Sequence, residues 1–138
     1  MKKLLFVCTG NTCRSPMAAA IFNKLAAERG VDALAESAGL NVRSEGPASG
    51  NAILAASDLG IDLSSHVSRQ VTNKMIDEAD RIYTMTSYQA QLLGSMAPSA
   101  AAKISPLSDM DIIDPFGGSL EIYRRTAKQL LDAVGFIL

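Results

Sequence analysis

The chain of 138 residues has a formal net charge of −1 at pH 7, with 48% hydrophobic and 20% charged residues. This length corresponds to a single domain, residues 1–138, that is large enough to bury a hydrophobic core, and the composition is typical of a soluble globular protein. Because the net charge is close to zero, we expect no binding to nucleic acid or to membrane surfaces.

The N-terminal residues follow the pattern of a strand and then a helix. The apolar run 4–7 predicts a first strand and is too short to be the apolar part of a signal peptide. From 15 to 29, apolar residues recur at intervals of three and four, which predicts an amphipathic helix that packs on a sheet and ends at Gly30.

Short strands and helices alternate along the rest of the chain. Further strands are predicted at 33–37, 81–85 and 102–106. Further helices are predicted at 48–59, 73–79 with Asn73 as its N-cap, 87–96 and 119–134. The segments 40–47, 61–72 and 107–118 are expected to be loops. This alternation favours an α/β fold in which a parallel sheet is covered by helices on both faces.

Residues 8–16, Cys-Thr-Gly-Asn-Thr-Cys-Arg-Ser-Pro, connect the first strand to the first helix. A helix N-terminus has unpaired N–H groups and a partial positive charge, so the loop that precedes it favours anions. Ligands of parallel α/β sheets also bind beyond the carboxyl ends of the strands, where Cys8 falls. A thiol in this position, with Arg14 and the hydroxyls of Thr12 and Ser15 near it in sequence, is expected to ionise readily and act as a nucleophile.

The spacing of this loop suits a tetrahedral oxyanion. If the residues after Cys8 curl so that successive N–H groups point inward, the oxyanion sits in the concavity with the sulfur beneath its central atom. The planar guanidinium of Arg14 matches two oxygens of a phosphoryl group better than the point charge of a lysine does. The residues expected to form this phosphate-binding cradle are Thr9, Gly10, Asn11, Thr12, Cys13, Arg14 and Ser15.

The loop also has residue types suited to its turns. Gly10 permits a close backbone approach or a positive φ, and Asn11 tolerates a left-handed conformation. Ser15 is the expected N-cap of the helix and Pro16 its first residue. Other interpretations are a buried structural thiol at Cys8 or a Walker-type nucleotide-binding loop, and the lack of a following Gly-Lys-Ser/Thr excludes the second.

A nucleophilic thiolate needs a second group that gives a proton to a poor leaving group. Asp114 is the best candidate for this acid, because Pro115 restrains the backbone after it and two glycines follow in the same loop. The alternative is an Asp-Pro turn without chemistry. Asp109 and Asp111 have no proline behind them and are expected to be solvated loop charges.

The only two cysteines, Cys8 and Cys13, both fall in this loop. Such usage indicates a reducing compartment, so we expect a cytoplasmic protein rather than a secreted one stabilised by disulfides. Cys13 either fills space or captures an oxidised Cys8 as a reversible disulfide that protects the nucleophile.

His66 is the only histidine, and a structural hydrogen-bonding role is preferred over that of a base. No group of residues has the spacing of metal ligands, and no dinucleotide-binding fingerprint is present. We therefore expect neither a metal nor a cofactor.

The motif Cys-x5-Arg-Ser-Pro after a first strand resembles the loop of the low-molecular-weight protein phosphatases, which begins Cys-x-Gly-Asn-x-Cys-Arg-Ser. The resemblance extends over nearly the whole chain and includes Ser-Ala-Gly at 37–39, His66 with Arg-Gln-Val-Thr at 69–72, and Asp-Pro at 114–115. It implies four parallel strands in a doubly wound, three-layer sheet. It also implies that Ser37 and His66 brace Asn11 and hold the loop in its strained form.

The same resemblance implies phosphorylated proteins as substrates. We expect a monomer that acts through a cysteinyl-phosphate intermediate. Thr12 replaces the aliphatic residue that is common in the family, and its shorter, polar side chain suits a guanidino leaving group better than a phenyl ring. Together with Asp-Pro-Phe-Gly-Gly at 114–118, the loop is similar to that of bacterial protein-arginine phosphatases. Phosphoarginine is thus the expected substrate, with Asp114 pairing with the guanidinium and Phe116 forming a wall of the pocket.

Three alternatives stay open at this point. The first is a phosphotyrosine phosphatase, although Phe116 is the only aromatic residue beside Asp114. An arsenate reductase would need further cysteines, and none follows Cys13. A non-catalytic phosphate-binding module would have no need of Asp114.

Overall fold

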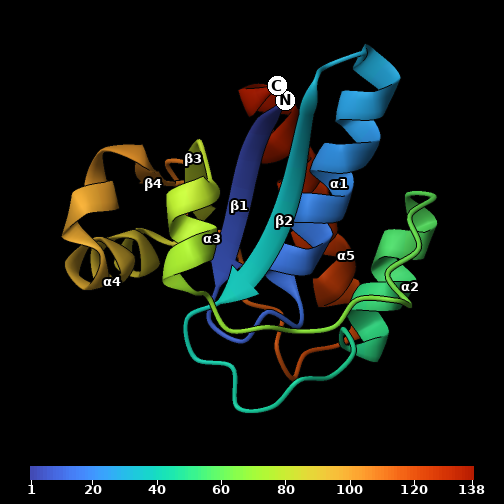
Figure 1. The fold of residues 1–138 in the computed structure, drawn as a ribbon. Coiled ribbons are helices and arrows are strands. Elements are labelled where there is room, and N and C mark those ends of the chain that lie inside the picture. Colours follow the sequence, from blue (N-terminus) through green and yellow to red (C-terminus); the bar gives the residue numbers. More distant parts are fainter.

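The computed structural model describes residues 1–138 and contains one sheet of four parallel strands in the order β2-β1-β3-β4 (Figure 1). The strands are β1 (Lys2–Cys8), β2 (Ala33–Gly39), β3 (Arg81–Thr84) and β4 (Ile104–Pro106). The α-helices are α1 (Arg14–Arg29), α2 (Gly50–Asp58), α3 (Asn73–Glu78), α4 (Ser87–Met96) and α5 (Leu120–Ile137), and a 3₁₀ helix, η1 (Pro98–Lys103), precedes β4. The predicted three-layer α/β fold is confirmed.

Two hydrophobic clusters fill the space on the two sides of the sheet. Alternate residues of β1 belong to different clusters: Phe6 packs with residues of α1, α2 and α5, whereas Leu5 and Val7 pack with residues of α3 and α4. Figure 1 shows these helices on opposite sides of the sheet. Burial on both faces explains why residues 4–8 of β1 form an unbroken apolar run rather than an alternating one.

The ends of several elements differ from the sequence-based prediction. The first helix begins at Arg14, with Cys13 at the N-cap and no side-chain cap, so Ser15 and Pro16 already lie within the first turn. The N-cap of α3 is Thr72, whose hydroxyl accepts from Met75 N, and not Asn73 as expected. The predicted helix stop at Gly30 is confirmed, since this residue has a φ of 66°.

The order of the strands brings the functional loops together. β1 is a central strand, and its last residue, Cys8, pairs in register with Gly39 at the end of β2. The loops that follow β1, β2 and β4 therefore start at the same edge of the sheet, while the chain ends lie at the opposite edge (Figure 1). No helix combines the length and the apolar character that crossing a membrane requires.

Candidate active site

The Cys8 side chain lies at the floor of the loop that follows β1 and is 3% exposed. Its sulfur is 2.9 Å from Ser15 Oγ, and the backbone N–H of Asn11 donates to it at 3.3 Å. The loop thus folds back over the sulfur as predicted, and both groups can stabilise a thiolate.

Asn11 holds this loop in place. Its φ of 56° is the only positive value among the non-glycine residues, so the predicted left-handed conformation is confirmed. The Asn11 amide donates to Ser15 Oγ at 2.8 Å and to Ser37 Oγ at 2.9 Å, and its carbonyl oxygen Oδ1 accepts from Arg69 N at 3.0 Å. The backbone oxygen of Asn11 is 2.8 Å from His66 Nε2. Ser37 and His66 thus make the contacts that the family resemblance implied.

Two expectations for the loop are wrong. Ser15 does not cap the helix, because its hydroxyl is engaged with Cys8 and Asn11. Gly10 has neither a positive φ nor a close neighbour, since a Cβ there would meet its nearest atom at 3.8 Å. The glycine that the backbone requires is Gly39, where a Cβ would lie 2.8 Å from Thr9 O. The loop rests directly on the end of β2 at this point.

Replacement of Asn11 by alanine is expected to destabilise the fold by ~3 kcal/mol, because three side-chain hydrogen bonds are lost and two of the partners, Ser15 and Ser37, are buried. Alanine is also strained at this φ, so turnover should fall as the loop loosens. Urea unfolding followed by circular dichroism measures the first effect. Asn41→Ala is the matched control, since this exposed side chain makes no hydrogen bond. An Asn11→Ala midpoint equal to that of wild type would contradict the assigned role.

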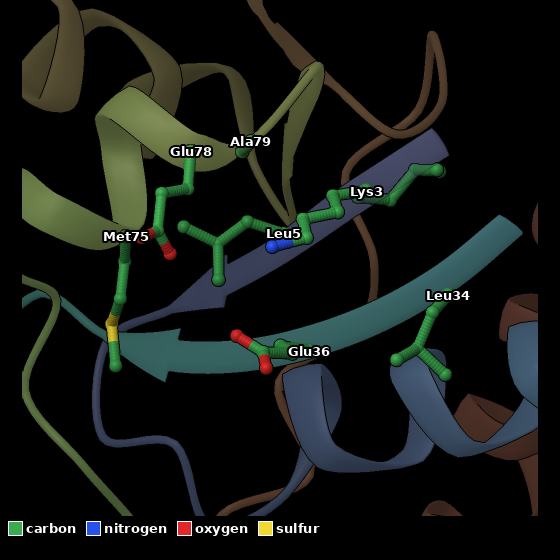
Figure 2. A pocket seen from close by; sticks show the side chains of 8 residues that line it. Lys3, Leu5, Leu34, Glu36, Met75, Glu78 and Ala79 are labelled. Carbon is green, nitrogen blue, oxygen red and sulfur yellow. The ribbon is translucent and has the colours of Figure 1, made fainter. Parts of the chain in front are cut away.

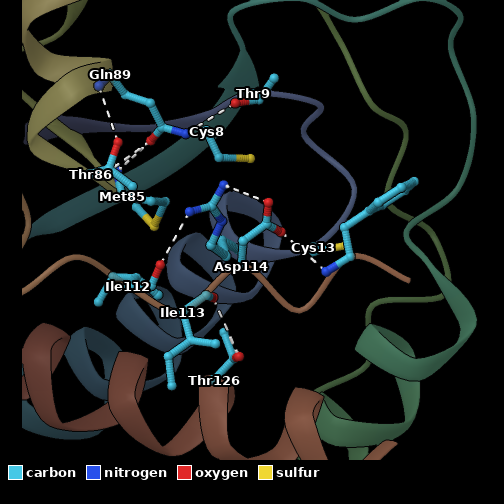
Figure 3. A network of polar contacts seen from close by, with 12 residues as sticks. Cys8, Thr9, Cys13, Met85, Thr86, Gln89, Ile112, Ile113, Asp114 and Thr126 are labelled. Carbon is cyan, nitrogen blue, oxygen red and sulfur yellow. Dashed lines mark hydrogen bonds and ion pairs between the residues drawn. The ribbon is translucent and has the colours of Figure 1, made fainter. Parts of the chain in front are cut away.

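Arg14 and Asp114 meet at the mouth of the loop. The guanidinium donates through Nη1 to Ile112 O at 3.2 Å, and its Nη2 is 3.6 Å from Asp114 Oδ2. Only 7% of the Arg14 side chain is exposed, compared with 60% of that of Asp114. Asp114 and Cys8 approach the same space from two different loops (Figure 3). A substrate between them would contact the nucleophile, the guanidinium and the carboxyl group together.

The loop after β4 places its other side chains away from this space. Asp109 is exposed and makes no hydrogen bond or ion pair, as expected for a solvated charge. Asp111 is also exposed, but its Oδ1 accepts from Ser87 N at the start of α4, a contact that the sequence did not predict. Asp114 Oδ1 accepts from Phe116 N at 3.1 Å, which forms a tight turn. The Phe116 ring is 78% exposed. It can therefore contact a substrate, as predicted, only where the bound molecule extends outward past this loop.

Cys13 faces a buried polar group that sequence reasoning did not predict. Its sulfur is 3.3 Å from Tyr123 OH on α5 and 3.6 Å from Ser49 Oγ. Burial raises the pKa of Tyr123, and the contact with Cys13 acts in the same direction, so the phenol is protonated at neutral pH. Tyr123 is buried in the core face of α5, and no local sequence pattern indicates that its hydroxyl would contact Cys13.

The remaining loop side chains line the entrance. Thr12 is half-buried, and its hydroxyl is 3.5 Å from Cys13 Sγ. Thr9 Oγ1 accepts from the buried Gln89 Nε2 at 3.1 Å (Figure 3). Both cysteines are free thiols, so the predicted disulfide between Cys8 and Cys13 stays a prediction.

Two pockets lie near the sheet, and neither contains Cys8. A pocket of about 40 Å³ between β1, β2 and α3 is lined by Leu5, Glu36 and Met75, among others (Figure 2). A polar cavity of about 370 Å³ is lined by Ser37, His66 and Arg69, among others, and so lies behind the loop that Asn11 supports. No group of three or more His, Cys, Asp or Glu side chains is placed to hold a metal ion.

Comparison with known proteins gives concordant matches over nearly the whole chain. The family model for low molecular weight phosphotyrosine protein phosphatase matches residues 3–137. A protein-arginine-phosphatase of Bacillus subtilis is 37% identical over 133 residues, which cover 92% of this chain and 88% of the relative.

Solved structures agree with this match. A low molecular weight protein tyrosine phosphatase from T. tengcongensis has a TM-score of 0.95 and 36% identity, covering 99% of this chain and 97% of the other. A cysteine-to-serine mutant of the arginine phosphatase YwlE, described as having a phosphorylated active-site serine, has a TM-score of 0.91 and 36% identity, covering 96% and 90%.

Proposed function

This chain belongs to the low molecular weight phosphotyrosine protein phosphatase family, and we propose that it hydrolyses phosphoarginine in proteins through a cysteinyl-phosphate intermediate. The observation that carries the proposal is the position of the Cys8 sulfur. It lies beneath a loop whose Asn11 N–H donates to it, and Arg14 and Asp114 meet at the mouth of the same loop.

The first step transfers the phosphoryl group to sulfur. The Cys8 thiolate attacks phosphorus in line with the P–N bond, while the guanidinium of Arg14 and the loop N–H groups bind the equatorial oxygens. As the P–N bond breaks, Asp114 gives its proton to the departing guanidino nitrogen. The products are a thiophosphate ester on Cys8, an Asp114 carboxylate and a free arginine side chain.

The second step returns the enzyme to its starting state. The Asp114 carboxylate takes a proton from water, the resulting oxygen attacks phosphorus, and the S–P bond breaks to release phosphate and the Cys8 thiolate. The phosphorylated serine described for the YwlE mutant supports a covalent intermediate at the nucleophile of that relative. One carboxyl group thus serves as acid and then as base.

Preference for phosphoarginine is supported by the chemistry of the entrance. The side chain of Thr12 is short and carries a hydroxyl, so at this position the entrance lacks the bulky aliphatic surface on which a phenyl ring would pack. Once it has given its proton, the exposed Asp114 carboxylate can pair with the freed arginine guanidinium in two-pronged geometry. The relatives named protein-arginine-phosphatase support the same substrate.

Phosphotyrosine is the second candidate substrate, because the family description names it and relatives such as that of T. tengcongensis are described as tyrosine phosphatases. Measurement of kcat/KM on phosphoarginine and phosphotyrosine forms of one peptide tests the choice. A higher value for phosphoarginine is expected, and a clear excess for phosphotyrosine would overturn the assignment.

Replacement of Thr12 by isoleucine is expected to shift the ratio of these two kcat/KM values toward phosphotyrosine by roughly tenfold, because the added apolar surface favours a ring. Thr12→Val is the matched variant, since it nearly keeps the volume of threonine and removes only the hydroxyl. A ratio that neither variant changes would remove Thr12 from the argument.

We further propose that residues 1–138 act as one phosphatase domain and that the protein is a cytoplasmic monomer whose partners are its phosphorylated substrates. With only two cysteines, both in the loop after β1, the sequence has no disulfide framework, which supports a reducing compartment. The net charge of −1 gives no support for nucleic acid or membrane surfaces as ligands.

A further inference from the structure

The acid loop, residues 111–114, has backbone hydrogen bonds on two sides, and successive residues bond to alternate sides. On one side, Ile112 N donates at 2.9 Å to the backbone oxygen of Met85, which follows β3, and Ile112 O accepts from Arg14 at the start of α1. On the side of α5, Gln129 Nε2 donates to Asp111 O and Gln129 Oε1 accepts from Ile113 N, both at 3.0 Å. The segment is therefore bonded like a strand between two neighbours, one of which is a single side chain.

Gln129 is the side chain that supplies this second neighbour. The side-chain amide has its N–H donors and its carbonyl acceptor in one plane. Here the nitrogen and the oxygen bond to backbone groups two residues apart, as a peptide unit would. Thr126, one turn earlier on α5, adds a longer contact of 3.4 Å to Ile113 O (Figure 3). Gln129 thus fixes the plane of the peptide units on both sides of Ile112.

The orientation of these two peptide units determines where the Arg14 and Asp114 side chains lie. The carbonyl of Ile112 points at Arg14 only while its flanking residues stay in place, and the next residue but one is Asp114. We propose that Gln129 is a positioning residue for the general acid, a proposal that rests on the function given above. It touches no reacting atom and acts by holding the backbone from which Asp114 projects.

Replacement of Gln129 by methionine tests the inference, because methionine has a similar size and helix propensity but cannot make either bond. Loss of the acid's position should matter most for leaving groups that need a proton. We expect kcat/KM on phenyl phosphate to fall about tenfold and that on p-nitrophenyl phosphate by less than roughly threefold.

Lys128→Met is the matched control, since this neighbour on α5 is exposed and makes no hydrogen bond. Amide exchange measured by NMR gives a direct readout: Ile113 N–H should exchange faster in Gln129→Met, while Ile112 N–H stays protected by Met85.

If Gln129→Met lowers kcat/KM by the same factor on phenyl phosphate and on p-nitrophenyl phosphate, or lowers neither, the inference is overturned. If wild-type protein were inactive on phenyl phosphate, p-nitrophenyl phosphate and phosphoarginine peptide, both the proposed function and the inference would be contradicted. If wild-type protein is active but Gln129→Met leaves the ratio of the two aryl phosphate kcat/KM values unchanged, the inference alone is contradicted.

Discussion

Replacement of Cys8 by serine is expected to lower turnover of a phosphoarginine peptide by roughly 10⁴-fold or more, while inorganic phosphate still binds. A serine hydroxyl is not ionised at neutral pH, so it lacks the nucleophilic form that the Asn11 N–H and the Ser15 hydroxyl stabilise on sulfur. The oxyanion-binding groups are backbone N–H groups and Arg14, which the substitution leaves in place. Turnover is measured as released phosphate, and binding by calorimetry.

Cys13→Ser is the matched control for this experiment, because it makes the same atomic change within the same loop. The sulfur of Cys13 contacts Tyr123 and Ser49. Its loss is expected to lower turnover by about tenfold at most, as for one hydrogen-bonded group near the site. Near wild-type hydrolysis by Cys8→Ser would contradict the covalent mechanism, and so would an equal loss in both variants.

The groups assigned to the chemistry could be predicted because their signals are local. Cys8 and Arg14 are separated by a short loop between a strand and a helix, and Asp114 is followed by a proline that restrains it. The same local logic failed for Ser15. Its residue type and place suit an N-cap, but Cys8 and Asn11 recruit its hydroxyl and the helix begins earlier. A tertiary contact outweighs a capping preference here.

Residues that support the site from a distance had no such signal. Gln129 and Gln89 are ordinary helix residues in sequence, and only the packing of α5 and α4 brings their amides to the loops. Gly39 is required because the loop after β1 rests on β2, which depends on strand order rather than on local pattern. Backbone-supporting side chains are identified by which main-chain groups need a partner, and that question can be answered only in three dimensions.

Replacement of Asp114 by asparagine is the second change with a large expected effect, a fall in kcat on phosphoarginine peptide of roughly 10²–10⁴-fold. Asparagine fits the same space and accepts from Phe116 N as Asp114 does, but it can neither give nor take the proton. Because its charge is also lost beside Arg14, inorganic phosphate should inhibit Asp114→Asn more strongly than wild type. Steady-state kinetics with phosphate as competitor measures both effects.

The effect of Asp114→Asn on two different substrates distinguishes an acid from a binding group. If Asp114 served only to hold the substrate guanidinium, its loss would raise KM on phosphoarginine peptide and leave hydrolysis of p-nitrophenyl phosphate, which has no guanidinium, unchanged. A proton donor acts on both substrates, and more strongly where the leaving group is poor. Asp109→Asn is the control, since this exposed carboxylate in the same loop makes no hydrogen bond or ion pair. Full activity of Asp114→Asn on both substrates would leave the Cys8 loop without the acid that the mechanism requires.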